Sequence, residues 1–79
     1  MNTDPLTWAA GVAAAIRTEL TVQRRTAVAL ADHLGIAPHT LAHRLSGDIP
    51  FDLVEVERVA EWLGLTASEL VARADHPTT

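Results

Sequence analysis

The feature that most constrains this chain is the stretch from Leu30 to Gly47, which has the pattern of two short helices joined by a tight turn. Gly35 supplies the positive φ that ends a helix without a Cβ clash, so the chain is expected to turn there. Pro38 suits the first position of a new helix, where the N–H group that proline lacks would have no partner. Leu41 and Leu45 are four residues apart and therefore share the inward face of that second helix. The stretch is thus predicted to form a helix-turn-helix motif whose second helix has a polar outer face.

Helix signals elsewhere predict a compact all-α domain with five helices. The 79-residue chain is 48% apolar and only 4% aromatic, and its Ala, Leu and Val residues recur at helical spacing. Candidate N-caps precede four of the helices, at Asp4, Thr26, Asp52 and Thr66. The predicted helices run from Pro5 to Val22, Ala27 to Leu34, Pro38 to Leu45, Leu53 to Leu63 and Ala67 to about Ala74. A chain of this length makes one domain, 1–79, with flexible ends expected at 1–4 and 75–79.

Composition argues against several classes of function. The chain has no cysteine, so disulfides and thiolate chemistry are excluded, and a reducing compartment, by default the cytoplasm, is expected. The N-terminal segment has neither the pattern of a signal peptide nor that of a membrane span, so no membrane partner is predicted. The sequence shows no paired carboxylates, phosphate loop or Ser/His/Asp arrangement. We therefore expect neither an enzyme nor a domain with a cofactor or a small-molecule ligand.

Charge is distributed unevenly along the chain. The formal net charge is −4, which by itself disfavours binding to nucleic acid. Four of the six arginines and three of the four histidines lie between positions 17 and 47, whereas seven of the ten acidic residues follow position 47. This uneven charge would orient the domain so that its helix-turn-helix motif faces a polyanion.

The run from Thr26 to Gly47, followed by Pro50-Phe51 and then by Glu57, Ala60 and Leu63-Gly64, resembles the phage-repressor-like helix-turn-helix family, the Cro, lambda-repressor and Xre group. The resemblance extends roughly from Ile16 to Ala72. It implies a lambda-repressor-like DNA-binding domain of five helices, with the helix-turn-helix at the second and third, that regulates transcription. It also implies a homodimer on a double-stranded DNA operator, a phage or prophage gene, and action in the cytoplasm of a bacterial host, on the nucleoid when bound.

The resemblance also assigns roles to residues of the motif. Base contacts fall on the start of the recognition helix and one turn later, and the side chains able to read a base edge there are His39, Thr40 and His43. Contacts to the DNA backbone are expected from Arg24, Arg25, Ala27, Arg44 and Ser46. Two positions depart from the family pattern, because Ala27 replaces a frequent glutamine and Ala37 replaces the usual serine or threonine cap.

Several of these residues have a second interpretation. Arg44 is alternatively expected to form an ion pair with Asp48 or with an acid of the fourth helix. His39 and His43 have the spacing of two metal ligands on one helical face, but no third ligand is near in sequence, so no metal is predicted. Trp62 either covers the edge of the core or contributes to a dimer surface. The candidates for that surface are Trp62, Leu65, Leu70 and Val71.

A competing function is that of a protein-interaction module, such as an antirepressor or dimerisation partner, that keeps the fold without binding an operator. The acidic balance of the chain and the few cationic residues on the recognition helix motivate it. The two functions differ in their response to salt, because affinity for DNA falls steeply with salt and a contact between apolar surfaces does not.

Overall fold

The computed structural model describes residues 5–75, which form five α-helices. Their bounds are α1 Pro5–Gln23, α2 Ala27–Leu34, α3 Pro38–Leu45, α4 Leu53–Trp62 and α5 Ala67–Asp75. The predicted all-α architecture is confirmed, and the predicted bounds differ only at the C-terminal ends of α1, α4 and α5, by one residue each. The ends predicted to be flexible lie outside the described residues, except for Asp75, which belongs to α5.

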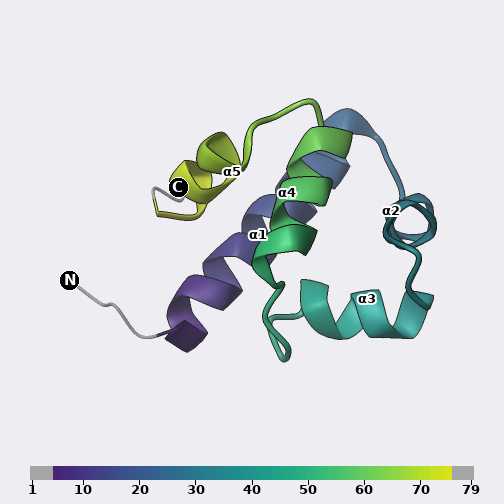
Figure 1. The fold of residues 1–79 in the computed structure, drawn as a ribbon, viewed down its shortest axis with the longest axis horizontal. Coiled ribbons are helices and arrows are strands. Elements are labelled where there is room, and N and C mark those ends of the chain that lie inside the picture. Colours follow the sequence, from purple (N-terminus) through teal and green to yellow (C-terminus); the bar gives the residue numbers. More distant parts are fainter. Residues whose placement is uncertain (1–4, 76–79) are drawn as a thin grey trace.

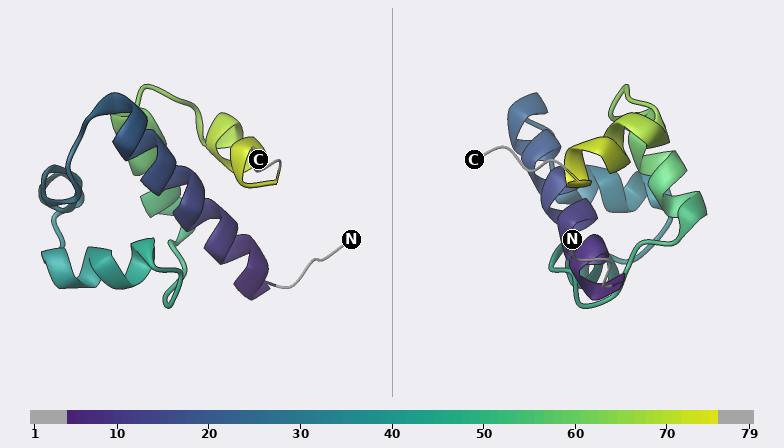
Figure 2. Two further views of the ribbon diagram at one scale, coloured as in Figure 1. Left: turned by 180° about the vertical axis from the view of Figure 1, so that it is seen from behind. Right: turned by 90° about the vertical axis from the view of Figure 1, so that its left-hand side faces the viewer.

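Helices α1 and α4 overlap in the view of Figure 1, with the α2–α3 pair on one side of them and α5 on the other. The side view shows that α1 and α4 lie apart from each other, on different sides of the molecule (Figure 2). Helix α5 packs against both α1 and α4, while α3 packs against α1 and α2 packs against α4. The helix-turn-helix motif is therefore held from within by the two central helices, and α3 lies at the edge of the molecule.

The core draws apolar side chains from all five helices. In α1 the four-residue repeat predicts an inward row, and Val12, Ile16 and Leu20 of that row are buried. The first member of the row, Trp8, has a side chain that lies outside the described part of the structure. The other helices, and the loop before α4, contribute Leu30, Leu34, Leu41, Leu45, Phe51, Val56, Val59 and Leu70. A single core of this kind requires each of the five helices to turn its apolar face inward.

Local capping signals set the helix ends. Thr26 accepts a hydrogen bond from the backbone N–H of Ala29, and so caps the start of α2 as predicted. Gly35 ends α2 with φ 70°, and its N–H is satisfied by the carbonyls of Ala31 and Asp32. The chain then needs only three residues, 35–37, to begin α3 at Pro38. The tight turn predicted between the two helices is therefore confirmed.

Helices α4 and α5 each begin with a capping box, in which a glutamate reaches back to the residue that caps the helix. In α4, Asp52 accepts from the N–H of Glu55, and Glu55 accepts from the N–H of Asp52. In α5, Thr66 and Glu69 make the same reciprocal pair. The N-caps predicted at Asp52 and Thr66 are therefore confirmed, each with a glutamate three residues later.

Candidate nucleic-acid interface

Helix α3 buries two leucines and presents polar side chains to solvent. Leu41 and Leu45 are 1% and 9% exposed, as their spacing predicts. His39, Ala42 and His43 are exposed, and Thr40 is half-buried at the edge of the same side. We call the surface formed by residues 39, 40, 42 and 43 the α3 outer face. The three predicted base readers therefore lie together on one helix, two of them in full contact with solvent.

The C-terminal end of α3 uses its polar groups in a local turn. The Ser46 hydroxyl donates to the carbonyl of His43 at 2.9 Å and accepts from the N–H of Asp48 at 3.4 Å. Nδ1 of His43 lies 3.6 Å from Oδ2 of Asp48, with both side chains mostly exposed. Ser46 thus organises the turn after α3, and Asp48 places a carboxylate beside the α3 outer face. The predicted contact of Ser46 with the DNA backbone stays a prediction.

Arg44 points toward α4 and not along the α3 outer face. Its guanidinium forms an ion pair with Glu55, and the two side chains are 19% and 14% exposed. This arrangement is the ion pair with an acid of the fourth helix that the sequence left open, and it corrects the expectation of a free phosphate-binding arginine. The reason lies in the packing, since the short turn after α3 brings the start of α4 next to the end of α3 (Figure 1).

Arg24 and Arg25 are adjacent in sequence but have different surroundings. The guanidinium of Arg25 lies 3.4 Å from the centre of the Trp62 ring and donates to the Trp62 carbonyl. The imidazole of His33 stacks on Trp62 with ring centres 6.0 Å apart. Arg25 is therefore engaged within the fold, and its predicted contact with the DNA backbone stays a prediction.

Arg24 is exposed, with a positive φ of 55°, and among residues 5–75 its side chain has no hydrogen-bond or ion-pair partner. It lies just before the start of α2, where the exposed Ala27 carries one of the first N–H groups of that helix. The N–H groups of a first helical turn are good donors to a phosphate. Of the residues predicted to contact the DNA backbone, those at the start of α2 therefore keep a cationic group and N–H groups that face solvent.

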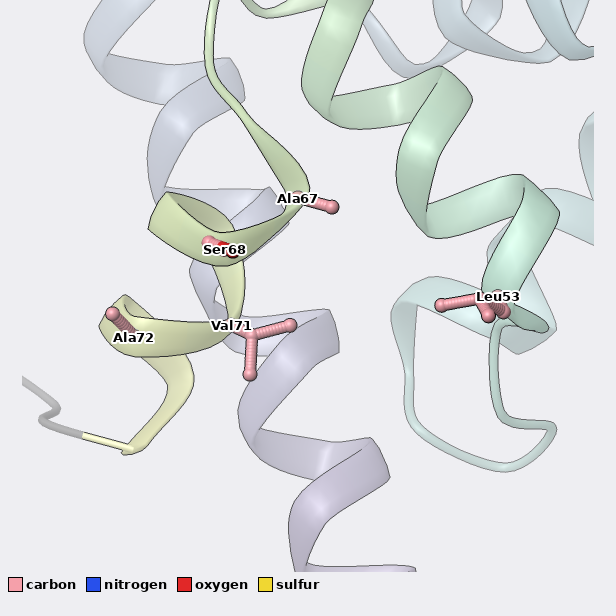
Figure 3. A pocket seen from close by; sticks show the side chains of 5 residues that line it. All are labelled: Leu53, Ala67, Ser68, Val71 and Ala72. Atoms are coloured by element: carbon pink, nitrogen blue, oxygen red, sulfur yellow. The ribbon is translucent and has the colours of Figure 1, made fainter.

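The dimer surface predicted on α4 and α5 is partly wrong. Leu70 is 0% exposed, because α5 turns this residue and not its neighbour Val71 into the core. Trp62, Leu65 and Val71 are half-buried and pack against the core. Trp62 therefore covers the edge of the core, which is one of the two roles expected for it. An apolar groove of about 400 Å³ lies nearby, between α5 and the start of α4 (Figure 3). Its lining residues are Leu53, Ala67, Ser68, Val71 and Ala72.

Two other kinds of site were considered across residues 5–75. In this part of the chain no cluster of three or more His, Cys, Asp or Glu side chains is arranged to hold a metal ion. None of the helices it contains combines the length and apolar character needed to cross a membrane.

The geometry defines a class of protein. A short helix, a three-residue turn with a left-handed glycine and a second helix with an exposed polar face form a helix-turn-helix domain. Residues 7–79 match the family model of the BetR domain, a helix-turn-helix-like domain. The chain belongs to the BetR domain family, which indicates a regulatory domain of the DNA-binding type. No curated protein and no solved structure matches the chain.

Proposed function

We propose that this domain is a sequence-specific DNA-binding regulator of transcription, of the Cro and repressor type, encoded by a phage or prophage and acting in a bacterial cytoplasm. One observation carries the proposal: α3 exposes a polar face directly opposite two buried leucines. A helix held in this way at the edge of a domain fits the major groove of B-DNA, which is about 12 Å wide. The family membership supports the regulatory class, and the resemblance to the Cro and Xre group supports the type.

In this proposal the α3 outer face reads bases and the start of α2 holds the DNA backbone. His39, Thr40 and His43 supply ring N–H and hydroxyl groups that bond to base edges in the groove. Arg24 and the first N–H groups of α2 bind phosphate. Since the other arginines have partners within the fold, few phosphates are neutralised. The slope of log K against log salt is therefore expected to be about −1 to −3 for each domain, less steep than for a protein with many phosphate contacts but clearly different from the near-zero slope of an apolar contact.

A selection experiment with random duplexes tests the proposal, followed by anisotropy titrations of the selected sequence. The double variant His39→Ala/His43→Ala is expected to bind the selected duplex at least about tenfold more weakly, since one base contact contributes about 1–3 kcal/mol. Thr18→Ala is the matched control, because Thr18 is exposed on α1, its hydroxyl bonds to the Ala14 carbonyl of the same helix, and it lines neither the α3 outer face nor the groove. Failure to select any sequence, or equal affinity of the two variants, would overturn the proposal.

A second candidate function is a protein-interaction module that keeps the fold without binding an operator. The observation that favours it is the engagement of most arginines within the fold, in a chain whose net charge is −4. A protein partner held by apolar contacts would bind with little dependence on salt. Absence of DNA binding at about 50 mM salt, together with salt-insensitive binding of a protein, would favour this function over the first.

We also propose that the domain binds its operator as a homodimer. The support is the apolar groove between α4 and α5 and the exposure of Leu53 and Val54 beside it, at 73% and 63%. Exposed apolar clusters of this kind are typical of surfaces that associate. A two-fold dimer would present two copies of α3 to two half-sites of an operator.

A further inference from the structure

A single carboxylate joins α3 to α4. One oxygen of Glu55, Oε1, accepts the backbone N–H of Asp52 at 3.0 Å and completes the capping box of α4. The other oxygen, Oε2, pairs with the guanidinium of Arg44 on α3. Glu55 therefore fixes the start of one helix and, through the same group, the end of another.

The ion pair between Arg44 and Glu55 contributes more to the placement of α3 relative to α4 than to the stability of the fold. Both side chains are largely withdrawn from solvent, and Nε of Arg44 is buried without a hydrogen-bond partner among the described residues. Attraction between two such charges is offset by the cost of removing them from water, so an apolar pair of similar size is often as stable. An ion pair has a directional geometry that an apolar contact lacks, and it can therefore fix how two elements are placed.

The remaining contacts of α3 show why its C-terminal end sets its orientation. Arg17 of α1 donates to the carbonyl of Leu45, so the end of α3 is bound to α1 as well as to α4. At its other end, α3 begins at Pro38, and Ala37 before it provides no side-chain cap. Leu41 and Leu45 hold α3 in the core, and the polar anchors at the Leu45 carbonyl and at Arg44 fix the angle of its C-terminal end.

We infer that Glu55 is a positioning residue for the recognition helix, and that through Arg44 it fixes the angle at which α3 presents His39 and His43. The inference rests on the proposed DNA-binding function and adds a determinant of specificity that does not itself touch DNA. Without the Glu55 carboxylate, α3 keeps its helical structure but presents its outer face at a less defined angle. The released Arg44 then binds phosphate, which strengthens binding to every sequence alike, so the loss of discrimination comes from the less defined angle of α3.

The variant Glu55→Gln tests this inference, because glutamine retains an oxygen that accepts the Asp52 N–H and loses the charge that pairs with Arg44. Glu69→Gln is the matched control. Glu69 occupies the same capping-box position in α5, where Thr66 N–H donates to it at 2.9 Å, and it makes no contact with α3 among its hydrogen bonds and ion pairs. The measurement is the ratio of affinities for the selected duplex and for an unrelated duplex, at one salt concentration.

Glu55→Gln is expected to lower that ratio by about tenfold or more, the size of one lost base contact, whereas Glu69→Gln should leave it nearly unchanged. The double variant Arg44→Met/Glu55→Gln removes the unpaired buried charge, so it is expected to regain thermal stability without regaining the ratio. Equal ratios for the two glutamine variants would overturn the inference. Recovery of the ratio in the double variant would also overturn it, because Glu55 would then act through stability alone.

Amide hydrogen exchange of the free protein separates this inference from the proposed function. Glu55→Gln is expected to speed exchange at the end of α3, including the Ser46 N–H that donates to Ala42, and Glu69→Gln is not. If the wild-type domain binds no duplex selectively, the proposed function fails. The exchange data still decide whether Glu55 anchors α3, since unchanged exchange in Glu55→Gln overturns the anchoring itself.

Discussion

At the scale of single residues, the fold uses three of its six arginines to bind the C-terminal ends of helices. Arg17 donates to the carbonyl of Leu45 at the end of α3, and Arg25 donates to that of Trp62 at the end of α4. Arg58 donates to the carbonyl of His33 at the end of α2, at 2.8 Å. The last carbonyls of a helix lack partners within it and carry partial negative charge, so a guanidinium is well suited to them. These side chains therefore stabilise the fold, and their guanidinium groups are already occupied when DNA is to be bound.

The adjacent pair Arg24 and Arg25 separates the two roles. Arg25→Ala is expected to lower the free energy of unfolding by about 1–2 kcal/mol, since it loses the bond to the Trp62 carbonyl and the contact with the ring. Arg24→Ala is expected to change it by at most about 0.5 kcal/mol and to weaken DNA binding instead. Urea unfolding followed by circular dichroism provides the measurement. Equal losses of stability in the two variants would contradict these assignments.

Glu69 gives the domain an acid-dependent contribution to stability. The backbone N–H of Thr66 donates to this carboxylate and, with the Thr66 side chain and the charge of Arg73, holds the pKa of Glu69 below its ordinary value of 4.5. A carboxyl whose pKa is lowered by folding stabilises the folded state above its unfolded pKa and stops doing so as pH falls through the folded value. Wild type is therefore expected to melt above Glu69→Gln at about pH 6, with the difference shrinking as the pH falls below the ordinary pKa of 4.5. A difference in melting temperature that is constant with pH would refute this.

At the scale of elements, the helix-turn-helix motif is specified by residues close together in the chain. Thr26 caps α2, Gly35 ends it and Pro38 opens α3, and each acts on backbone groups no more than four residues away. The capping boxes at the starts of α4 and α5 are equally local. Interactions of this range can be recognised in a sequence, and for that reason the five helices and the first residue of each were predicted, whereas the last residues of α1, α4 and α5 were each missed by one position.

Gly35 is the element-scale position with the clearest expected effect. Its φ is 70°, and a Cβ built there would meet nothing within 4 Å, so a substitution is penalised only by backbone strain. Gly35→Ala is expected to destabilise the domain by about 1–2 kcal/mol, and Gly35→Asn by less, because asparagine tolerates the left-handed region better. Chemical denaturation of the three proteins provides the test. An alanine variant as stable as wild type would show that the turn does not require this conformation.

Contacts between elements far apart in the chain could not be predicted from the sequence. Asp48 and the acids of the fourth helix were both plausible partners for Arg44, and only the packing of α3 on α4 selects Glu55. In α5, Leu70 and Val71 are adjacent and equally apolar, so periodicity alone did not say which one enters the core. The three arginines that bind helix ends act across 25 to 37 positions of the chain, a range over which sequence pattern gives no direction.

At the scale of the whole molecule, the α2–α3 pair and α5 lie on opposite sides of α1 and α4 in the view of Figure 1. The polar α3 outer face and the apolar groove beside α5 are therefore carried by different helices, and the two proposed contacts, with DNA and with a second copy, need not compete. The domain can be described as two central helices that support a polar reading surface and an apolar groove.

Self-association through the groove is testable by analytical ultracentrifugation over a range of protein concentrations. The wild-type domain is expected to approach the mass of a dimer at high concentration, and Leu53→Ser to remain a monomer, because it removes an exposed apolar side chain that lines the groove. Val28→Ser is the control, since Val28 is 66% exposed on α2 and does not line the groove. A wild-type monomer at every concentration would remove the dimer from the proposal.

The central claim is that the α3 outer face is the surface that meets DNA. The most direct test is to titrate the isotope-labelled domain with its selected duplex and to follow the backbone amide signals by nuclear magnetic resonance. We expect the largest shifts at residues 39–43 and at the start of α2, with α5 nearly unaffected. Shifts confined to α5 and the start of α4, with the signals of α3 unchanged, would contradict the claim.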